Sequence, residues 1–334
     1  MNSERYSRQL RFPPIGEAGQ RRLAHASVAV VGCGALGSAV SEQLVRAGVG
    51  SVRIIDRDFV ELSNLQRQCL FTEADAAANR PKAVAAAEHL HAINNGVSIH
   101  AAVAHLDVNN ADELLAADVV IDGSDNFPTR HLINEWCCRA GVPWVYGGVV
   151  GSEGLSLPII PGRSPCLRCL QDELPAAGEG PTCDSAGVIA PAVHLVASRQ
   201  VALGLRLLIE PDAVEPVLVS VDAWRDQYRR FEVVSWRNPH CLVCGDEPQY
   251  PSLTASTTNA VVLCGRDAIQ LPAGRVVDLP ALAQRVGAAL ARNDYLLRWK
   301  EGELTLTAFV DGRFLVQGVA NEARALALRD RWLG

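Results

Sequence analysis

The chain has 334 residues, which is enough for one large α/β domain and a smaller second one. Hydrophobic residues make up 49% of the chain and charged residues 20%, a composition that supports a buried core and excludes extensive disorder. The net charge of -6, with acidic and basic residues interspersed, gives no basic surface of the kind that binds nucleic acids or anionic membranes. Because the first residues are polar and form no apolar signal segment, we expect a cytoplasmic protein with no nucleic-acid or membrane partner.

The expected elements alternate between helices and strands along the first part of the chain. A helical lead-in over 1–25 precedes a strand, a glycine-containing helix start and a second strand within 27–56. Three more buried strands are expected at 97–103, 118–123 and 143–150, with helices around 81–93, 111–116 and 129–140. This alternation predicts an α/β fold, a Rossmann-like, doubly wound and mostly parallel sheet.

The sequence changes character in its second half. Residues 161–187 are rich in Pro, Gly and Cys and are expected to form a loop, 188–209 a hydrophobic helix, and 216–235 paired strands that extend the sheet in antiparallel fashion. After a polar linker we expect a small α+β domain, so the predicted domains are 1–250 and 251–334. Its expected elements are a hairpin at 260–271, a helix at 279–291, strands within 295–319 and a last helix at 321–333.

A glycine-rich turn follows the first strand. Gly32, Gly34 and Gly37 lie where backbone N–H groups and a helix N-terminus can approach a phosphate, and Asp56 ends the second strand, where a carboxylate can accept hydrogen bonds from ribose hydroxyls. This pattern suits both NAD and ATP. A triphosphate under attack needs additional cations and usually Mg²⁺, so the rest of the sequence has to separate the two nucleotides.

Polar residues downstream favour the triphosphate. Asn64, Arg67 and Lys82 follow the second strand, and Lys82 stands at a helix start, where a cation is unfavourable unless an anion offsets its charge. Asp125 follows a buried strand at the sheet edge where α/β proteins bind ligands, and a magnesium or phosphate role is expected there. The alternatives are a surface position for Lys82 and a helix-capping role for Asp125.

Two C-x-x-C pairs indicate a metal site. Four thiolates can complete a tetrahedral Zn²⁺ site with no open position, which makes a structural zinc the favoured interpretation over a redox-active pair; the ligands are Cys166, Cys169, Cys241 and Cys244. Cys183 belongs to neither pair and lies in a polar, glycine-containing loop, where it is either a nucleophile or an inert thiol.

Eight motifs occur in an order that resembles the MoeB/ThiF family of adenylyltransferases, relatives of ubiquitin-activating enzymes. They are RYSRQ, VGCGALGS, IIDRDFVELSNLQRQ, NRPK, DGSDN, PCLRC, TCDSAGV and CLVC, and they span roughly residues 1 to 245. The resemblance implies that the chain uses ATP and Mg²⁺ to adenylate the C-terminal carboxylate of a small ubiquitin-like sulfur carrier ending in Gly-Gly.

The resemblance also implies individual residue roles. Asp56 would bind the ribose, while Asn64, Arg67 and Lys82 would bind phosphates, and Asp125 would position magnesium. Arg8 would reach the ATP site of the partner subunit in a homodimer. Cys183 would match a cysteine that captures the activated carrier in some members of the family, and the four paired cysteines would bind zinc.

The tail does not resemble the rhodanese domain of some relatives, so we expect the sulfur donor to be another protein, such as a cysteine desulfurase. The pathway stays open between molybdopterin, thiamine, tRNA thiolation and carrier conjugation. Three other functions remain as alternatives: adenylation of a non-protein carboxylate of the tRNA-modification type, an NAD(P)-dependent oxidoreductase, and a non-catalytic zinc scaffold.

Overall fold

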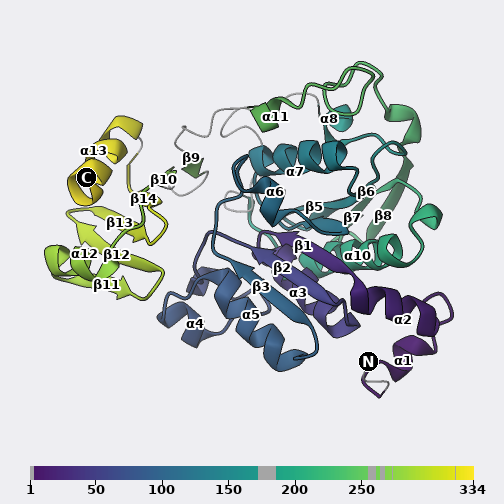
Figure 1. The fold of residues 1–334 in the computed structure, drawn as a ribbon, viewed down its shortest axis with the longest axis horizontal. Coiled ribbons are helices and arrows are strands. Elements are labelled where there is room, and N and C mark those ends of the chain that lie inside the picture. The colour runs from purple at the N-terminus through teal and green to yellow at the C-terminus, as the bar shows by residue number, and fades with distance from the viewer. Residues whose placement is uncertain (1–3, 172–185, 255–260, 264–267, 273, 320) are drawn as a thin grey trace.

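The computed structural model of the chain describes residues 4–171, 186–254, 261–263, 268–272, 274–319 and 321–334. The described residues form two sheets, one of eight strands and one of six, and the smaller sheet belongs to the C-terminal part of the chain (Figure 1). The domain boundary between residues 250 and 251 stays a prediction. The short helix α11 (Pro251–Thr254) packs on α7 of the large domain, where the Ser252 N–H donates to the Glu135 carboxylate.

The large sheet is parallel in its first half and antiparallel in its second, as expected. Its strand order is β3-β2-β1-β4-β5-β6-β7-β8, and the direction changes at β6. The strands are β1 (Ser27–Val31), β2 (Ser51–Ile55), β3 (Ser98–Ala102), β4 (Val119–Asp122), β5 (Trp144–Val150), β6 (Glu153–Ile159), β7 (Val217–Asp222) and β8 (Gln227–Glu232). The order reverses on the two sides of β1, so the carboxyl ends of β1, β2 and β4 lie at one edge, where such sheets bind ligands.

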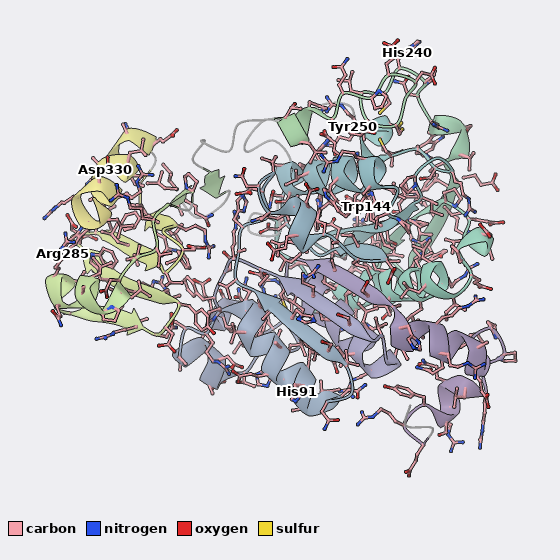
Figure 2. All side chains as sticks on the ribbon, in the orientation of Figure 1. His91, Trp144, His240, Tyr250, Arg285 and Asp330 are labelled. Atoms are coloured by element: carbon pink, nitrogen blue, oxygen red, sulfur yellow. The ribbon has the colours of Figure 1, made fainter. Side chains whose placement is uncertain are left out.

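Helices cover both faces of this sheet because its central strands are apolar on both sides. In β1, Val28 and Val30 pack on one face with α3, α5 and α10, whereas Ala29 and Val31 pack on the other with α6, α7 and α8. Figure 2 shows Trp144 of β5 inside this three-layer arrangement. The helices are α3 (Ala35–Ala47), α5 (Lys82–Ile93), α6 (Ala111–Leu114), α7 (Phe127–Ala140), α8 (Leu167–Leu170) and α10 (Ala190–Ile209).

Helix α10 is, among the described residues, the helix that meets the length and hydropathy of a membrane span. Of its most apolar window, 56% is buried inside the molecule, where it packs on α3, β5 and β6. These contacts account for its apolar composition as that of a core helix.

The chain starts with two helices at the amino ends of the strands. They are α1 (Ser7–Leu10) and α2 (Gly16–His25), and α2 leads directly into β1. Gln9 fixes them to the C-terminal end of α3 by donating to the carbonyl of Ala47 at 2.9 Å. The short helix α4 (Glu73–Ala77) lies near the opposite end of the sheet, before α5.

The small domain is a six-stranded antiparallel sheet in the order β11-β12-β13-β14-β10-β9. Its strands are β9 (Val261–Leu263), β10 (Ala268–Leu271), β11 (Ala289–Arg292), β12 (Leu296–Glu301), β13 (Leu304–Phe309) and β14 (Phe314–Gln317). Helices α12 (Leu279–Val286) and α13 (Glu322–Leu333) cover one face, around Trp299 and Leu306. Arg285 and Asp330 lie on these helices, away from the large sheet (Figure 2).

Two details of the sequence prediction were wrong or incomplete. The helix expected at 279–291 ends at Val286, because Gly287 takes a φ of +79° and the chain then continues into β11. Strand β6 was not predicted as an element, although it pairs with β5 along its whole length.

Candidate nucleotide and metal sites

The glycine turn after β1 is compact except at Gly34. A Cβ on Gly32, whose φ is +86°, would lie 2.5 Å from the Gly123 carbonyl oxygen, and one on Gly37 would lie 1.8 Å from the Gly32 carbonyl oxygen. At Gly34 the nearest atom to such a Cβ is the side-chain nitrogen of Gln68 at 3.9 Å. The fold therefore requires glycine at the first and third positions, whereas the second is explained by close approach of a ligand to the start of α3.

Asp56 is held rigidly beside this turn. Its carboxylate accepts hydrogen bonds from the N–H of Cys33 at 2.6 Å and from the N–H of Asp58 at 2.7 Å. Burial raises the pKa of the Asp56 carboxyl, and the nearby charge of Lys82 opposes that shift. The structure thus joins two predicted site elements, the glycine turn and the acidic end of β2, through hydrogen bonds.

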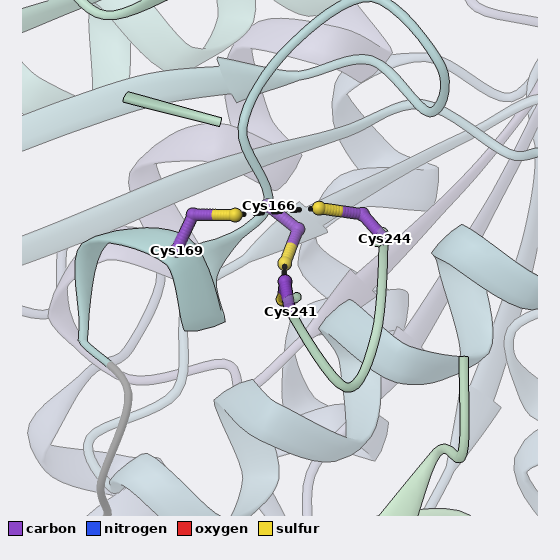
Figure 3. A group of neighbouring side chains, drawn as sticks. All are labelled: Cys166, Cys169, Cys241 and Cys244. Atoms are coloured by element: carbon purple, nitrogen blue, oxygen red, sulfur yellow. Dashed lines mark hydrogen bonds between the residues drawn. The ribbon is translucent and has the colours of Figure 1, made fainter. Parts of the chain in front are cut away.

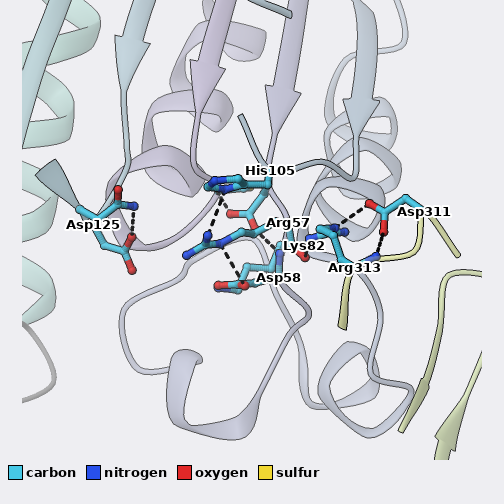
Figure 4. A network of polar contacts seen from close by, with 10 residues as sticks. Arg57, Asp58, Lys82, His105, Asp125, Asp311 and Arg313 are labelled. Carbon is cyan, nitrogen blue, oxygen red and sulfur yellow. Dashed lines mark hydrogen bonds and ion pairs between the residues drawn. The ribbon is translucent and has the colours of Figure 1, made fainter. Parts of the chain in front are cut away.

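Lys82 is buried at the first position of α5, and its ammonium lies 3.5 Å from the carboxylate of Asp58. The anion that such a helix start favours is therefore supplied in part by the chain itself. Figure 4 shows this pair with Arg57, whose guanidinium contacts His105 at 3.0 Å. The sequence analysis did not predict Asp58, although a second carboxylate two residues after Asp56 was a visible signal.

Asn64 and Arg67 lie on the segment between β2 and α4. Asn64 is buried in a short 3-10 helix, Leu62–Asn64, and its side-chain oxygen accepts from the Glu61 N–H at 3.1 Å. Arg67 is half-buried and donates to the Ser63 carbonyl at 2.9 Å. Gln68, which was not predicted, is buried close to Gly34, and its Oε1 has no hydrogen-bond partner among the described residues. Its position makes it a further candidate for contacting a ligand.

Asp125 is exposed just after β4, at the same sheet edge as Lys82 (Figure 4). The helix-capping alternative for Asp125 is wrong, because Asn126 caps α7 by accepting from the Thr129 N–H at 2.9 Å. Asn126 also donates to the Asp125 carboxylate at 3.1 Å. The Asp125 side chain is thus oriented by its neighbour and accessible to a cation.

A buried arginine fixes the loop that follows β4. Arg130, on α7, donates to the carboxylate of Asp122 at 3.1 Å and to the carbonyl of Ser124 at 2.9 Å. The sequence analysis missed it, because a single arginine inside a helix carries no pattern. Arg130 connects the end of β4 to the loop that carries Asp125.

Arg8 lies far from this edge within its own chain. Its side chain is exposed on α1, and the adjacent Gln9 contacts the C-terminal end of α3, whereas Gly34 stands at the N-terminal end. A helix of 13 residues is about 20 Å long, so one chain does not bring Arg8 to the glycine turn. Cys183 lies outside the described residues.

The four paired cysteines form one cluster, shown in Figure 3. Their sulfur atoms all lie within 4.8 Å of one another, with Cys166 and Cys241 at 3.6 Å and Cys169 and Cys244 at 3.3 Å. A tetrahedral zinc with bonds of about 2.3 Å requires sulfur atoms about 3.8 Å apart. The donor set and its spacing therefore fit a zinc site that joins two segments of the chain, and the Asn238 N–H adds a hydrogen bond to Cys169 at 3.4 Å.

Comparisons with known proteins identify the family of the chain. The sulfur carrier protein ThiS adenylyltransferase of Bacillus subtilis is 43% identical over 99% of both chains. The sulfur carrier protein adenylyltransferase of Thermus thermophilus is 41% identical over 73% of this chain and 92% of its own. Among solved structures, Escherichia coli MccB shares the fold with a TM-score of 0.63, at 24% identity over 74% of this chain and 75% of that one. The ThiF family model matches residues 6–243, and the chain therefore belongs to the ThiF family and is an adenylyltransferase of that type.

Proposed function

We propose that this adenylyltransferase transfers AMP from ATP to the C-terminal carboxylate of a small ubiquitin-like sulfur carrier ending in Gly-Gly, with release of pyrophosphate. The observation that carries the proposal is the sheet edge where the open turn at Gly34, the fixed carboxylate of Asp56, the buried Lys82 and the accessible Asp125 gather. A hydride-transferring NAD(P) enzyme would leave the last two residues without a function.

The arrangement suits in-line attack of a carboxylate oxygen on the α-phosphorus. The helix start at Gly34 supplies free N–H groups to the phosphates, Asp56 orients the ribose, and Asn64, Arg67 and Lys82 stabilise negative charge on the phosphates and on the leaving pyrophosphate. Asp125 would hold Mg²⁺, which supplies further charge neutralisation when bound. The chain contributes no nucleophile to this step, because the carrier carboxylate attacks directly.

The relatives support a particular class of carrier. The Bacillus subtilis protein, which matches over nearly its full length, is named for the carrier ThiS, so we propose a ThiS-like carrier rather than one of the other sulfur carriers. A Gly-Gly tail suits a narrow approach to the nucleotide, since it has no side chains to clash. The sulfur would then come from a separate donor such as a cysteine desulfurase, and Cys183 would act only after adenylation.

Two features of the assembly belong to the same proposal. The four-cysteine cluster would bind one structural Zn²⁺, because its thiolates leave no open coordination position. The enzyme would act as a homodimer, since Arg8 lies about one helix length from its own nucleotide turn and would have to serve the partner's site. A cytoplasmic location completes the proposal.

Carrier-dependent exchange of ³²P-labelled pyrophosphate into ATP tests this function. Lys82→Ala and Asp125→Ala should each reduce exchange at least about a hundredfold, because Lys82 would contact the transferring phosphates and Asp125 would hold the Mg²⁺ that neutralises them. Lys300→Ala, at an exposed position of the small domain, is the matched control and should retain wild-type exchange. Cys183→Ala should also retain exchange, since adenylation precedes any thiol chemistry.

Two results would contradict the proposal. Full exchange in folded Lys82→Ala and Asp125→Ala variants would move the phosphate site elsewhere. Exchange that depends on a small-molecule carboxylate, and not on a Gly-Gly carrier, would replace the protein substrate by a non-protein one.

A further inference from the structure

The small domain contacts the large domain at the segment that follows Asp56. Phe59 is buried in a cluster with residues of the small sheet, and the guanidinium of Arg298 lies over its ring at 5.1 Å from the centroid. Asn293 donates to the carbonyl of Asn79 at 3.0 Å, just before the helix that starts with Lys82. The face of the small sheet opposite α12 and α13 therefore lies against the nucleotide-binding edge.

One contact in this interface reaches the nucleotide site itself. Arg313 is 1% exposed, its Nε donates to the Asp311 carboxylate at 2.6 Å, and its guanidinium lies 4.3 Å from the centre of the Phe309 ring. Its Nη1 donates to the carbonyl oxygen of Arg57 at 3.0 Å, across a separation of 256 residues. Figure 4 shows Arg313 and Asp311 beside the group that contains Arg57, Asp58 and Lys82.

The Arg57 carbonyl and the Asp58 N–H belong to the same peptide group. That N–H donates to the Asp56 carboxylate at 2.7 Å, so one rigid peptide plane is bound at its oxygen by Arg313 and at its hydrogen by Asp56. A cation on the carbonyl also polarises the peptide and strengthens its N–H as a donor. The backbone carbonyl of Asp58 further accepts from the Lys82 N–H at 2.9 Å, which ties the same segment to α5.

We propose that Arg313 is a positioning residue through which the small domain orients the Asp56 carboxylate for the ribose of ATP. This inference rests on the proposed function, in which Asp56 binds the ribose. Without Arg313, the carbonyl oxygen of Arg57 loses its hydrogen bond and this peptide plane can rotate. The Asp56 carboxylate then loses the orientation that the Asp58 N–H imposes, and only the Cys33 N–H still holds it in place. The effect should fall mainly on the ribose, because the peptide plane is bonded directly to the Asp56 carboxylate, whereas Lys82 is bonded to the next carbonyl along the chain, that of Asp58.

The test measures binding of two nucleotides to the full-length protein by isothermal titration calorimetry without carrier. ATP and 2′,3′-dideoxy-ATP differ only in the ribose hydroxyls. Arg313→Met keeps much of the side-chain volume but removes the donors, and we expect it to weaken ATP binding about five- to tenfold, the value of about one hydrogen bond. Its effect on dideoxy-ATP should be less than about twofold, because that analogue makes no ribose hydrogen bonds.

Three further variants make the result decisive. Asp56→Ala removes the acceptor and should abolish the preference of the protein for ATP over dideoxy-ATP. Arg313→Lys, which keeps a cationic donor, should retain part of the preference that Arg313→Met loses. Arg331→Met removes an exposed arginine of α13 that pairs with Glu301 on the far face of the small domain, and it should bind both nucleotides as the wild type does. Thermal melts verify folding, and Arg313→Lys carries the comparison if Arg313→Met unfolds.

The outcomes distinguish the ribose-binding role of Asp56 from the positioning role of Arg313. If Asp56→Ala keeps the wild-type preference for ATP, the ribose assignment fails, and the inference about Arg313 fails with it. If Asp56→Ala loses the preference but the Arg313 variants keep it, or weaken the binding of both nucleotides equally, only the positioning role is overturned.

Discussion

Replacement of Arg130 by methionine tests how the Asp125 loop is supported. Arg130 is 8% exposed and Asp122 is fully buried, so this ion pair is almost completely removed from water. The guanidinium also donates to the Ser124 carbonyl at 2.9 Å and the Gly147 carbonyl at 3.2 Å. Methionine fills much of the same space but leaves the Asp122 carboxylate without its cation.

The expected cost follows from the unpaired charge. Removal of one partner of a buried ion pair typically destabilises a protein by about 3 to 5 kcal/mol, a large part of the stability of a domain. Burial raises the pKa of Asp122 and Arg130 opposes that shift, so the pKa rises further in Arg130→Met. The folded variant then binds a proton more readily than the unfolded chain, and its deficit should shrink as the pH falls from 7 to 5.

Urea unfolding of the wild type, Arg130→Met and the double variant Asp122→Asn/Arg130→Met at both pH values measures these effects. The double variant should recover part of the loss, because it removes the buried charge as well as its partner. Arg139→Met, which breaks an exposed pair with Asp112, is the control and should cost less than about 1 kcal/mol. A loss below about 1 kcal/mol in Arg130→Met, or no recovery in the double variant, would refute the reasoning.

Three further predictions concern the metal, a buried histidine and the dimer. Protein purified without chelator should contain about one zinc per chain. Cys241→Ser should lose this zinc and have a lowered Tm, whereas Cys69→Ser, at an exposed position, should keep both the zinc and the wild-type Tm. Less than about half an equivalent of zinc, with four freely titratable thiols, would exclude the site. Burial and Arg168 lower the pKa of His131 to about 4, so the unfolded state binds more protons between the ordinary value of 6.5 and pH 4, and stability falls as the pH falls. His131→Leu should remove about 2 kcal/mol of the loss between pH 7 and 5 in urea unfolding, whereas the exposed His91→Ala should not. An unchanged pH dependence in His131→Leu would disprove the assignment. A mixture of Arg8→Ala and Lys82→Ala chains should recover about a quarter of wild-type exchange, since half of the dimers would be mixed and each would contain one intact site of two. Mixtures with the Arg8→Ala/Lys82→Ala double variant are the control. Mixed dimers that recover no more exchange than this control would contradict a site shared between subunits.

The features that the sequence predicted correctly are those that local patterns encode. Apolar alternation in β1, the spacing of Gly32, Gly34 and Gly37, and Asp56 at the end of β2 all lie within one βαβ unit, where strand and helix periods dictate which residues meet. The cysteine pairs were equally readable, because each C-x-x-C presents two thiols locally. Only their assembly into one cluster, across 75 residues, required the fold.

The prediction failed where two local signals competed. The apolar run after Leu279 continues through residue 291, but Gly287 ends the helix in a left-handed conformation and the following residues pair as β11. A short apolar segment fits either a helix or a strand, and the neighbouring strand β12 decides which one forms. Strand β6 was missed for another reason, since its pairing with β5 comes from tertiary contact and not from a strong alternation of its own.

The sequence by itself thus determined the βαβ unit with its glycine turn, the two cysteine pairs and the family. The tertiary structure alone decided that Arg130 supports the loop of Asp125 and that Arg313, from the small domain, binds the peptide group next to Asp56. An arginine in a helix or at a strand end carries no signal of its distant partner. Its hydrogen bonds depend on the packing of separate elements, and burial then makes those bonds strong, because water no longer competes for the donors.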